Sequence, residues 1–225
     1  MRIDIISIFP KCFEAVLNES IIKRAQEKKK VKILLHDLRD YSGDKHRKID
    51  DHPYGGGAGM LMRPQPIFHA VEAIQAKARG ARVILLCPQG KKLEQNDAKR
   101  LSKEKHLILI CGHYEGIDER VRLALVDEEI SIGDYVLTGG ELPAMVLVDC
   151  VVRLIPGVLG DKNSLNFESF ESNLLEYPQY TRPAVFRRLR PPKILFSGDH
   201  NKIEKWRKAE ALKMTKRRRP DLLKK

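Results

Sequence analysis

The sequence lacks the features of a secreted, membrane-spanning or repetitive protein. Its four cysteines are scattered and form no CxxC pair, which favours reduced thiols over a disulfide framework. No apolar run approaches the roughly 18 residues that a membrane-spanning helix needs. The first ten residues are too short for a secretion signal and include Asp4. We therefore expect a soluble, cytoplasmic protein with no membrane partner.

Metal-ligand spacing is also missing. The seven histidines and four cysteines form no pattern typical of a zinc site. The sequence has no repeats and no low-complexity tracts, so it does not indicate a solenoid or a disordered chain. Its apolar share of 42% is that of an ordinary globular protein.

Positive charge is abundant. Lysine and arginine number 42 against 30 acidic residues, which gives a net charge of +12 and a pI near 9.6. A surplus of this size predicts a polyanionic partner, and nucleic acid before a membrane. The alternative from charge alone is a soluble basic protein without such a partner.

Apolar segments alternate with helical patterns in the first two thirds of the chain. Strands are predicted at 3–9, 31–37, 82–87 and 106–111, and helices at 10–26, 66–78, 94–103 and 117–126. The intervening segment 39–63 is charged and rich in glycine, and we expect a long loop there. Near-continuous apolar strands alternating with helices predict an α/β fold, a parallel sheet with helices on both faces.

A change of composition marks a second domain. The segment 141–155 is apolar almost all round, which is typical of a helix buried in a core or a subunit interface. A polar linker follows it, and then a basic segment with an amphipathic helix expected over 201–214. We place the first domain at 1–160, the linker at 161–176 and a small, mainly helical C-terminal domain at 177–225.

Glycine-bearing turns follow three of the apolar runs. They are Pro88–Gly90, Cys111–Gly116 and Thr138–Glu141. Ligands of parallel sheets bind outside the carboxyl ends of the strands, and glycine lets the backbone approach a ligand closely. We expect a small-molecule pocket lined by main-chain groups at this edge of the sheet.

Other segments have two interpretations each. Gly55–Gly59 is a phosphate-binding loop or a flexible one, because it lacks the ending of a P-loop. Asp149 and Arg153 have the spacing of an ion pair, and Arg153 is alternatively a cation at the edge of the pocket. Glu168 and Glu171 are solvated linker carboxylates or candidates for a general base.

Six motifs occur together and in order: DDHPYGGGAGM (Asp50–Met60), CPQGKKL (Cys87–Leu93), CGHYEGIDERV (Cys111–Val121), EISIGDYVLTGGELPA (Glu129–Ala144), RLIPGVLG (Arg153–Gly160) and YPQYTRP (Tyr177–Pro183). In this combination the sequence resembles the bacterial tRNA (guanine-N1)-methyltransferases over essentially its whole length. The resemblance implies a domain of the SPOUT class with a deep trefoil knot around 85–140. It also implies a homodimer that binds S-adenosylmethionine within the knot and tRNA across the two subunits.

The resemblance assigns a set of residues to the cofactor site: Leu86, Pro88, Gly90, Gly112, Tyr114, Glu115, Gly116, Ile132, Gly133, Tyr135, Leu137, Gly139, Gly140 and Pro143. It implies methyl transfer to N1 of the guanine 3′ of the anticodon, tRNA position 37. Magnesium assistance is also implied, with no residue pattern that locates the ion.

Two residues carry the chemistry that the resemblance implies. Arg153 matches the arginine that stabilises charge on guanine O6, and Glu168 stands where the family has an aspartate that removes the N1 proton. Glu176 likewise stands where relatives often have aspartate, near the cofactor's amino group. A non-catalytic RNA-binding module of the same fold is the alternative. A ribose 2′-O-methyltransferase lacks support because the linker and YPQYTRP belong to the guanine family.

Overall fold

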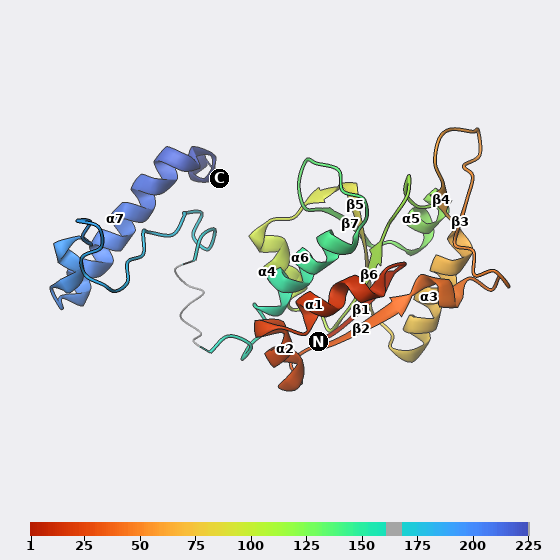
Figure 1. Cartoon of the computed structure of the whole chain (residues 1–225), viewed down its shortest axis with the longest axis horizontal. Helices are drawn as coiled ribbons and strands as arrows, with labels where there is room; N and C mark the ends of the chain where they lie inside the picture. The colour runs from red at the N-terminus through yellow and green to blue at the C-terminus, as the bar shows by residue number, and fades with distance from the viewer. Residues whose placement is uncertain (161–167, 225) are drawn as a thin grey trace. The chain divides into compact units, whose positions relative to one another are not determined.

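The first unit of the protein is built on a five-stranded parallel sheet. In the computed structural model, which describes residues 1–160 and 168–224, the strands lie in the order β2-β1-β6-β5-β7 (Figure 1). The expected parallel α/β sheet is therefore confirmed. The central strand β6 is buried along its whole length. The strands are β1 Arg2–Ser7, β2 Lys32–Asp37, β5 Arg82–Lys92, β6 His106–Cys111 and β7 Glu128–Ser131.

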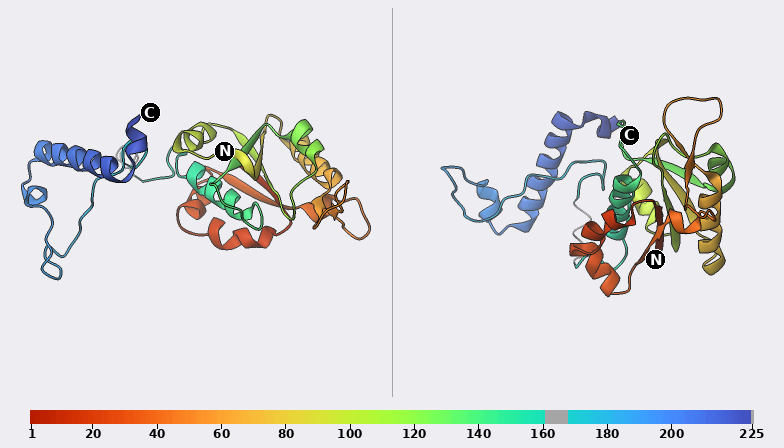
Figure 2. Two further views of the ribbon diagram at one scale, coloured as in Figure 1. Left: turned by 90° about the horizontal axis from the view of Figure 1, so that it is seen from above. Right: turned by 45° about the vertical axis from the view of Figure 1, so that its right-hand side comes forward.

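Helices cover both faces of this sheet (Figure 2). Successive side chains of a strand point to opposite faces, so Leu107 and Leu109 of β6 enter one apolar cluster while Ile108 and Ile110 enter the other. On the first face pack α1 (Glu14–Leu17), α2 (Ser20–Glu27), α4 (Gln95–Leu101) and α6 (Glu141–Val152). On the second lie α3 (Pro64–Lys77) and α5 (Glu119–Leu125).

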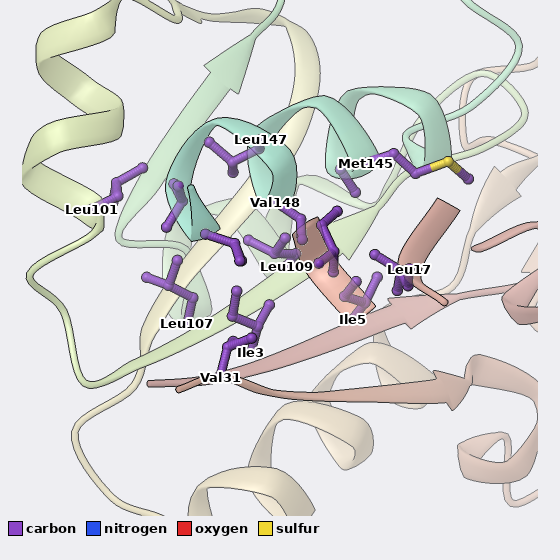
Figure 3. Close-up of a cluster of buried hydrophobic side chains, with 14 of the residues drawn as sticks. Ile3, Ile5, Leu17, Val31, Leu101, Leu107, Leu109, Met145, Leu147 and Val148 are labelled. Carbon is purple, nitrogen blue, oxygen red and sulfur yellow. The ribbon is translucent and has the colours of Figure 1, made fainter. Parts of the chain in front are cut away.

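Helix α6 is the largest contributor to the first cluster. Its residues Leu147 and Val148 are buried and lie over Ile5 and Leu109 of the sheet (Figure 3). Each such side chain stabilises the fold by roughly 1.5–3 kcal/mol relative to an exposed one. The helix begins at Glu141, directly after the Thr138–Gly140 turn, so core packing fixes where that turn lies.

The chain divides into two units, Met1–Gly160 and Asp161–Lys225. In its described residues the second unit has one long helix, α7 (His200–Arg218), and short 3-10 helices at Lys193–Phe196 and Pro220–Lys224. Residues 161–167 of the expected linker lie outside the described residues. No helix of the described part has both the length and the apolar character that crossing a bilayer requires.

Several predicted boundaries were wrong. The helix expected over 10–26 is a 3-10 turn, Pro10–Phe13, followed by α1 and α2. Residues 18–19 separate these two helices, where the Gln26 side chain donates to the Leu17 carbonyl at 2.8 Å and satisfies the end of α1. The helix expected over 117–126 begins only at Glu119, because the Asp118 carboxylate accepts from the Arg120 N–H and caps it.

Two expected loops contain strand. Strand β5 does not end at Cys87 but continues to Lys92, with a register shift against β7 between Leu86 and Lys91. Pro88 lies in this shift, and it has no N–H to donate to a ladder. The expected loop 39–63 contains a short antiparallel pair, β3 (Asp50–Asp51) and β4 (Leu61–Met62). Two-residue strands are too short to show periodicity.

Helix α7 is longer than the expected 201–214. The Asp199 carboxylate accepts from the Lys202 N–H and begins the helix one residue earlier. At the other end, Lys216, Arg217 and Arg218 form the last turn. Cations there interact favourably with the negative end of the helix dipole, so the basic run extends the helix instead of ending it.

A buried carboxylate joins three neighbouring strands of the sheet. Asp4 of β1 is fully buried and accepts hydrogen bonds from Arg2 (2.6 and 2.9 Å), His36 of β2 (2.7 Å) and His106 of β6 (2.7 Å). Burial by itself raises the pKa of Asp4, but the hydrogen bonds from His36, Arg2 and His106 outweigh it and hold the pKa well below its usual range.

This shift makes the stability of the unit depend on pH. A carboxyl group whose pKa is depressed on folding stabilises the folded state above its unfolded pKa of about 3.9, and that stabilisation is lost as the pH falls below it. We expect Asp4→Asn to lower the free energy of unfolding by about 3 kcal/mol at pH 7, because it removes the charge that three donors share. The deficit should shrink below about pH 4, where the carboxyl group of the unfolded chain begins to protonate while Asp4 of the folded protein stays ionised.

Urea unfolding of both proteins at pH 7 and pH 3.5 measures this difference. Asp40→Asn is the matched control, since Asp40 pairs with Arg47 at the exposed surface, and it should change stability little at either pH. An Asp4→Asn deficit of the same size at both pH values would contradict the assignment.

Candidate functional site

The glycine-bearing turns come together at the carboxyl edge of the sheet. They enclose a pocket of about 240 Å³ at the ends of β6 and β7, beside the register shift of β5. Of the residues that the resemblance assigns to the cofactor, thirteen lie on its wall: Leu86, Pro88, Gly112, Tyr114, Glu115, Gly116, Ile132, Gly133, Tyr135, Leu137, Gly139, Gly140 and Pro143.

Gly90 is the exception, because it is not on the pocket wall. It lies instead against the backbone of β7, where an added Cβ would come within 2.4 Å of the Ile130 nitrogen. Glycine is therefore needed here for close packing of β5 on β7. In this structure Gly90 supports the wall that Ile132 and Gly133 form, and does not itself line the pocket.

Main-chain contacts hold two of the turns against one another. The Gly140 N–H donates to the Gly112 carbonyl at 2.8 Å, and His113 pairs with Gly139 in an antiparallel bridge. An added Cβ at Gly140 would lie 2.7 Å from Cys111 Cα and 2.9 Å from Gly112 N. The φ of Gly140 is −82°, which any residue adopts. Glycine is therefore required here because the Cys111–Gly112 backbone is so close, and not because of the backbone conformation.

The segment 59–62 supports the pocket from another side. The Glu115 N–H donates to the Met60 carbonyl at 3.0 Å, and the Met62 N–H donates to the Gly116 carbonyl at 2.9 Å. Gly59 lies so close to the Glu115 side chain that an added Cβ would come within 2.5 Å of it. The glycine cluster of the long loop is thus packed, at this end, against a turn of the pocket.

A buried hydrogen bond fixes the start of α6. The Ser7 hydroxyl of β1 donates to the Glu141 carboxylate at 2.7 Å, and both residues are buried. Glu141 directly follows Gly140, so this contact orients the turn that closes the pocket. Sequence reasoning missed both residues, because their link spans 134 positions and neither stands out in a local pattern.

One cationic side chain reaches the pocket. Arg122 of α5 is the only lysine or arginine that the described residues place on the wall. It pairs with Glu129, and the Cys87 thiol donates to the same carboxylate at 3.0 Å. Burial and this hydrogen bond raise the pKa of the Cys87 thiol. The thiol therefore stays protonated at neutral pH and is a poor nucleophile.

His113 also lies on the wall without having been predicted. Its ring makes edge contacts with Phe9 and Tyr114, with centroids 5.2 Å apart in each case. Its Nδ1 is buried and has no hydrogen-bond partner within the described part of the chain. The only sequence signal for it was its place inside the CGHYEG turn.

The predicted catalytic residues belong to different units. Arg153 caps the end of α6 in the first unit, where its N–H donates to the Asp149 carbonyl at 3.3 Å and its side chain is half-buried. The side-chain ion pair between Asp149 and Arg153 stays a prediction. Glu168 belongs to the second unit and lies on a turn, with the Glu171 N–H donating to its carbonyl at 3.3 Å.

Metal ligands do not gather in the described residues. Over 1–160 and 168–224, no three or more histidine, cysteine, aspartate or glutamate side chains form a group that could hold an ion. Some carboxylates of the first unit are used in hydrogen bonds and ion pairs, as Asp4 and Glu129 are. The wall of the pocket is formed mainly by the glycine turns and by apolar side chains such as Leu86, Ile132 and Pro143.

Comparison with known proteins agrees with the motifs. A family model described as tRNA (Guanine-1)-methyltransferase TrmD matches residues 1–225. A Geobacillus kaustophilus protein named tRNA (guanine-N(1)-)-methyltransferase is 61% identical over 223 residues, which cover 99% of this chain and 91% of the relative. A Bacillus subtilis protein of the same name is 56% identical over 225 residues, covering 100% and 93%. The resemblance is thus confirmed, and the chain belongs to the tRNA (guanine-1)-methyltransferase family and is a methyltransferase.

Proposed function

We propose that this protein transfers a methyl group from S-adenosylmethionine to N1 of the guanine 3′ of the anticodon, at tRNA position 37. The observation that carries the proposal is the pocket made by the glycine turns, in a chain of this family. Its wall offers backbone N–H and C=O groups, which suit the edge of an adenine ring, and Arg122 as a cation. Gly139 and Gly140 lie on this wall, and an added Cβ at either position would strike a neighbouring residue.

The same contacts support a threaded arrangement of the chain. The Gly112–Gly116 turn bonds to Gly140, and the start of the Gly133–Leu137 loop follows β7, which packs on Gly90. We propose that these segments form the trefoil knot of the SPOUT class. A knot would hold the turns in place without ligand, which reduces the entropy lost on binding.

An apolar surface on α6 supports the proposed homodimer. Leu142 and Val146 are 57% and 42% exposed, one helical turn apart, and Val136 of the preceding loop is 83% exposed. Apolar side chains grouped in this way are typical of a surface that a partner covers. We propose that a second copy of the chain covers it.

The second unit is the proposed tRNA-binding domain. Between Glu176 and Asp199 the sequence has no acidic residue but five cations, Arg182, Arg187, Arg188, Arg190 and Lys193. Residues 179–190 are all exposed, and exposed arginines pair well with phosphates. We therefore propose domains at 1–160 and 177–225 joined by a linker at 161–176, in a protein that works where tRNA is found, in the cytoplasm.

The proposed mechanism needs two protein groups. Bound in the pocket, S-adenosylmethionine would supply an electrophilic methyl group. Glu168 would accept the proton of guanine N1, so that the N1 electron pair can form the new bond to the methyl carbon. The bond between that carbon and sulfur would break at the same time, with S-adenosylhomocysteine as the leaving group. Arg153 would stabilise the negative charge that develops on O6 as that proton leaves. We assign no step to the magnesium ion that the resemblance implies, because the described residues offer no ligand cluster for it.

The reaction itself is tested with two tRNA transcripts. We expect labelled methyl groups to pass from S-adenosylmethionine to a transcript with guanine at position 37, and not to one with adenine there. Adenine has no proton on N1 for the base to remove, and it has no oxygen at position 6 for the arginine to stabilise. Digestion of the product should locate the label on N1. Tight tRNA binding without transfer, or equal labelling of both transcripts, would contradict the proposal.

The proposed base is tested by an isosteric change. Glu168→Gln should reduce turnover by about a hundredfold or more, since general-base catalysis contributes on the order of 10²–10⁴-fold. The dissociation constant of S-adenosylmethionine, measured by calorimetry, should stay within about twofold. Glu171→Gln is the matched control on the same turn and should keep its turnover. Retained turnover in Glu168→Gln together with loss in Glu171→Gln would move the base to Glu171.

The role of the close approach at Gly140 is tested by adding one carbon. Gly140→Ala should weaken S-adenosylmethionine binding roughly tenfold to a hundredfold, because overpacking of this kind costs about 1–3 kcal/mol. Gly160→Ala is the control, since an added Cβ there meets nothing within 4 Å. Unchanged affinity in Gly140→Ala would show that the Cys111–Gly112 backbone yields and that the contact does not shape the site.

A further inference from the structure

The segment that carries the proposed base is a closed loop. We call residues Glu168–Tyr177 the carboxylate loop. The Phe170 N–H donates to the Leu174 carbonyl at 2.8 Å, and the Glu176 N–H donates to the Ser169 hydroxyl at 3.0 Å. Phe170 and Asn173 have φ values of 75° and 54°. Side chains other than glycine seldom adopt this left-handed region, so the loop has one specific backbone conformation.

This loop is attached to α7 at three points. The Leu175 N–H donates to the Thr215 hydroxyl at 2.8 Å. The Arg219 guanidinium lies over the Phe170 ring at 5.8 Å, and the Arg207 guanidinium lies over the Tyr177 ring at 4.9 Å. Phe170 lies near the start of the loop, and Leu175 and Tyr177 lie at its end. Their partners are two residues of α7 and Arg219, which directly follows that helix.

Thr215 is the central attachment. Its side chain is fully buried, and it is the only polar residue of the second unit that is buried among residues 168–224. Its hydroxyl donates to the Ala211 carbonyl of its own helix at 2.8 Å and accepts from Leu175. A hydroxyl has one hydrogen to donate. Because Ala211 takes that hydrogen, the oxygen is oriented with its lone pairs available to the loop.

We propose that Thr215 is a positioning residue for methyl transfer, and that it acts by fixing the carboxylate loop, and with it Glu168, to α7. Loop and helix then move as one piece. Glu168 begins this loop, so the attachment of the loop to α7 sets where the Glu168 backbone lies relative to the helix. This inference rests on the proposed function, which makes Glu168 the base.

The effect of losing this attachment falls on the rate and not on binding. The hydrogen bonds of the Thr215 hydroxyl are to Ala211 and Leu175, and they involve none of the exposed arginines of the second unit at positions 187, 188 and 190. A base displaced by about 1 Å loses on the order of a hundredfold in rate. Affinities for S-adenosylmethionine and tRNA depend on other groups and should not change.

Valine has nearly the shape of threonine but cannot accept a hydrogen bond. In the full-length protein, we expect Thr215→Val to lower the single-turnover rate of methyl transfer tenfold to a hundredfold, with both dissociation constants within about twofold of wild type. Thr215→Ser keeps the hydroxyl and should restore most of the rate. Ser172→Ala removes an exposed hydroxyl of the same loop and serves as the matched control. Circular dichroism of all variants checks that α7 is intact.

A double-mutant cycle shows whether Thr215 acts through Glu168. If it does, Thr215→Val should cost little further rate in the Glu168→Gln background, because the carboxylate that it positions is gone. An equal loss in both backgrounds would overturn the proposal. So would a wild-type rate in Thr215→Val, or a failure of Thr215→Ser to restore the rate.

The Leu175 amide gives a readout that does not depend on catalysis. We expect its hydrogen exchange to accelerate in Thr215→Val and to stay slow in Thr215→Ser and Ser172→Ala. Unchanged exchange in Thr215→Val would overturn the attachment itself. If Glu168→Gln keeps wild-type turnover, the proposed base fails and the positioning role fails with it. If Glu168→Gln loses turnover while Thr215→Val does not, only the positioning role fails.

Discussion

The close approach of Gly140 to the Cys111–Gly112 backbone is the constraint on which the site depends. It joins the exit of the central strand β6 to the start of α6, through a main-chain hydrogen bond of 2.8 Å. Apolar packing of α6 on the sheet, with Leu147 and Val148 buried, holds one side of this contact. The buried Ser7–Glu141 hydrogen bond holds it from β1. Every turn of the pocket is thus tied to the core, and a pocket built in this way is largely formed before a ligand arrives.

In the proposed mechanism, the groups that act in methyl transfer are divided between the two units. The first contains the pocket and Arg153, and the second contains the carboxylate loop and the exposed cations. Methyl transfer to a base within a folded RNA requires the proton acceptor to meet the substrate from a defined direction. In our proposal, the attachment of the carboxylate loop to α7 through Thr215 sets that direction within the second unit. The apolar surface of α6 at Leu142 and Val146 bears on the first unit. A second copy of the chain that covers it, as we propose, would fix how the two pockets are arranged relative to one another.

Much of the fold could be predicted from local pattern. Strands β1 and β6 are short and mostly apolar, and the helix beginning at Glu141 is apolar almost all round, so their burial followed from composition. The points where helices and strands begin and end were harder to predict. The separation of α1 from α2 depends on a Gln26 side chain that reaches the Leu17 carbonyl, and the extension of β5 to Lys92 depends on pairing with β7 beyond Pro88. Both boundaries depend on contacts between residues that are separated along the chain, which local secondary-structure propensity does not include.

The sequence by itself determined the family, the parallel α/β class and the set of glycine turns that form the pocket, because motifs, periodicity and the demand for glycine are local properties of the chain. The tertiary structure decided why each residue is needed. It showed that Gly90 packs on Ile130 and does not line the pocket, and that Asp4 unites three strands. It also showed that Thr215 holds a loop forty residues away. These are relations between segments distant along the chain, and only folding brings their atoms within a hydrogen bond of one another.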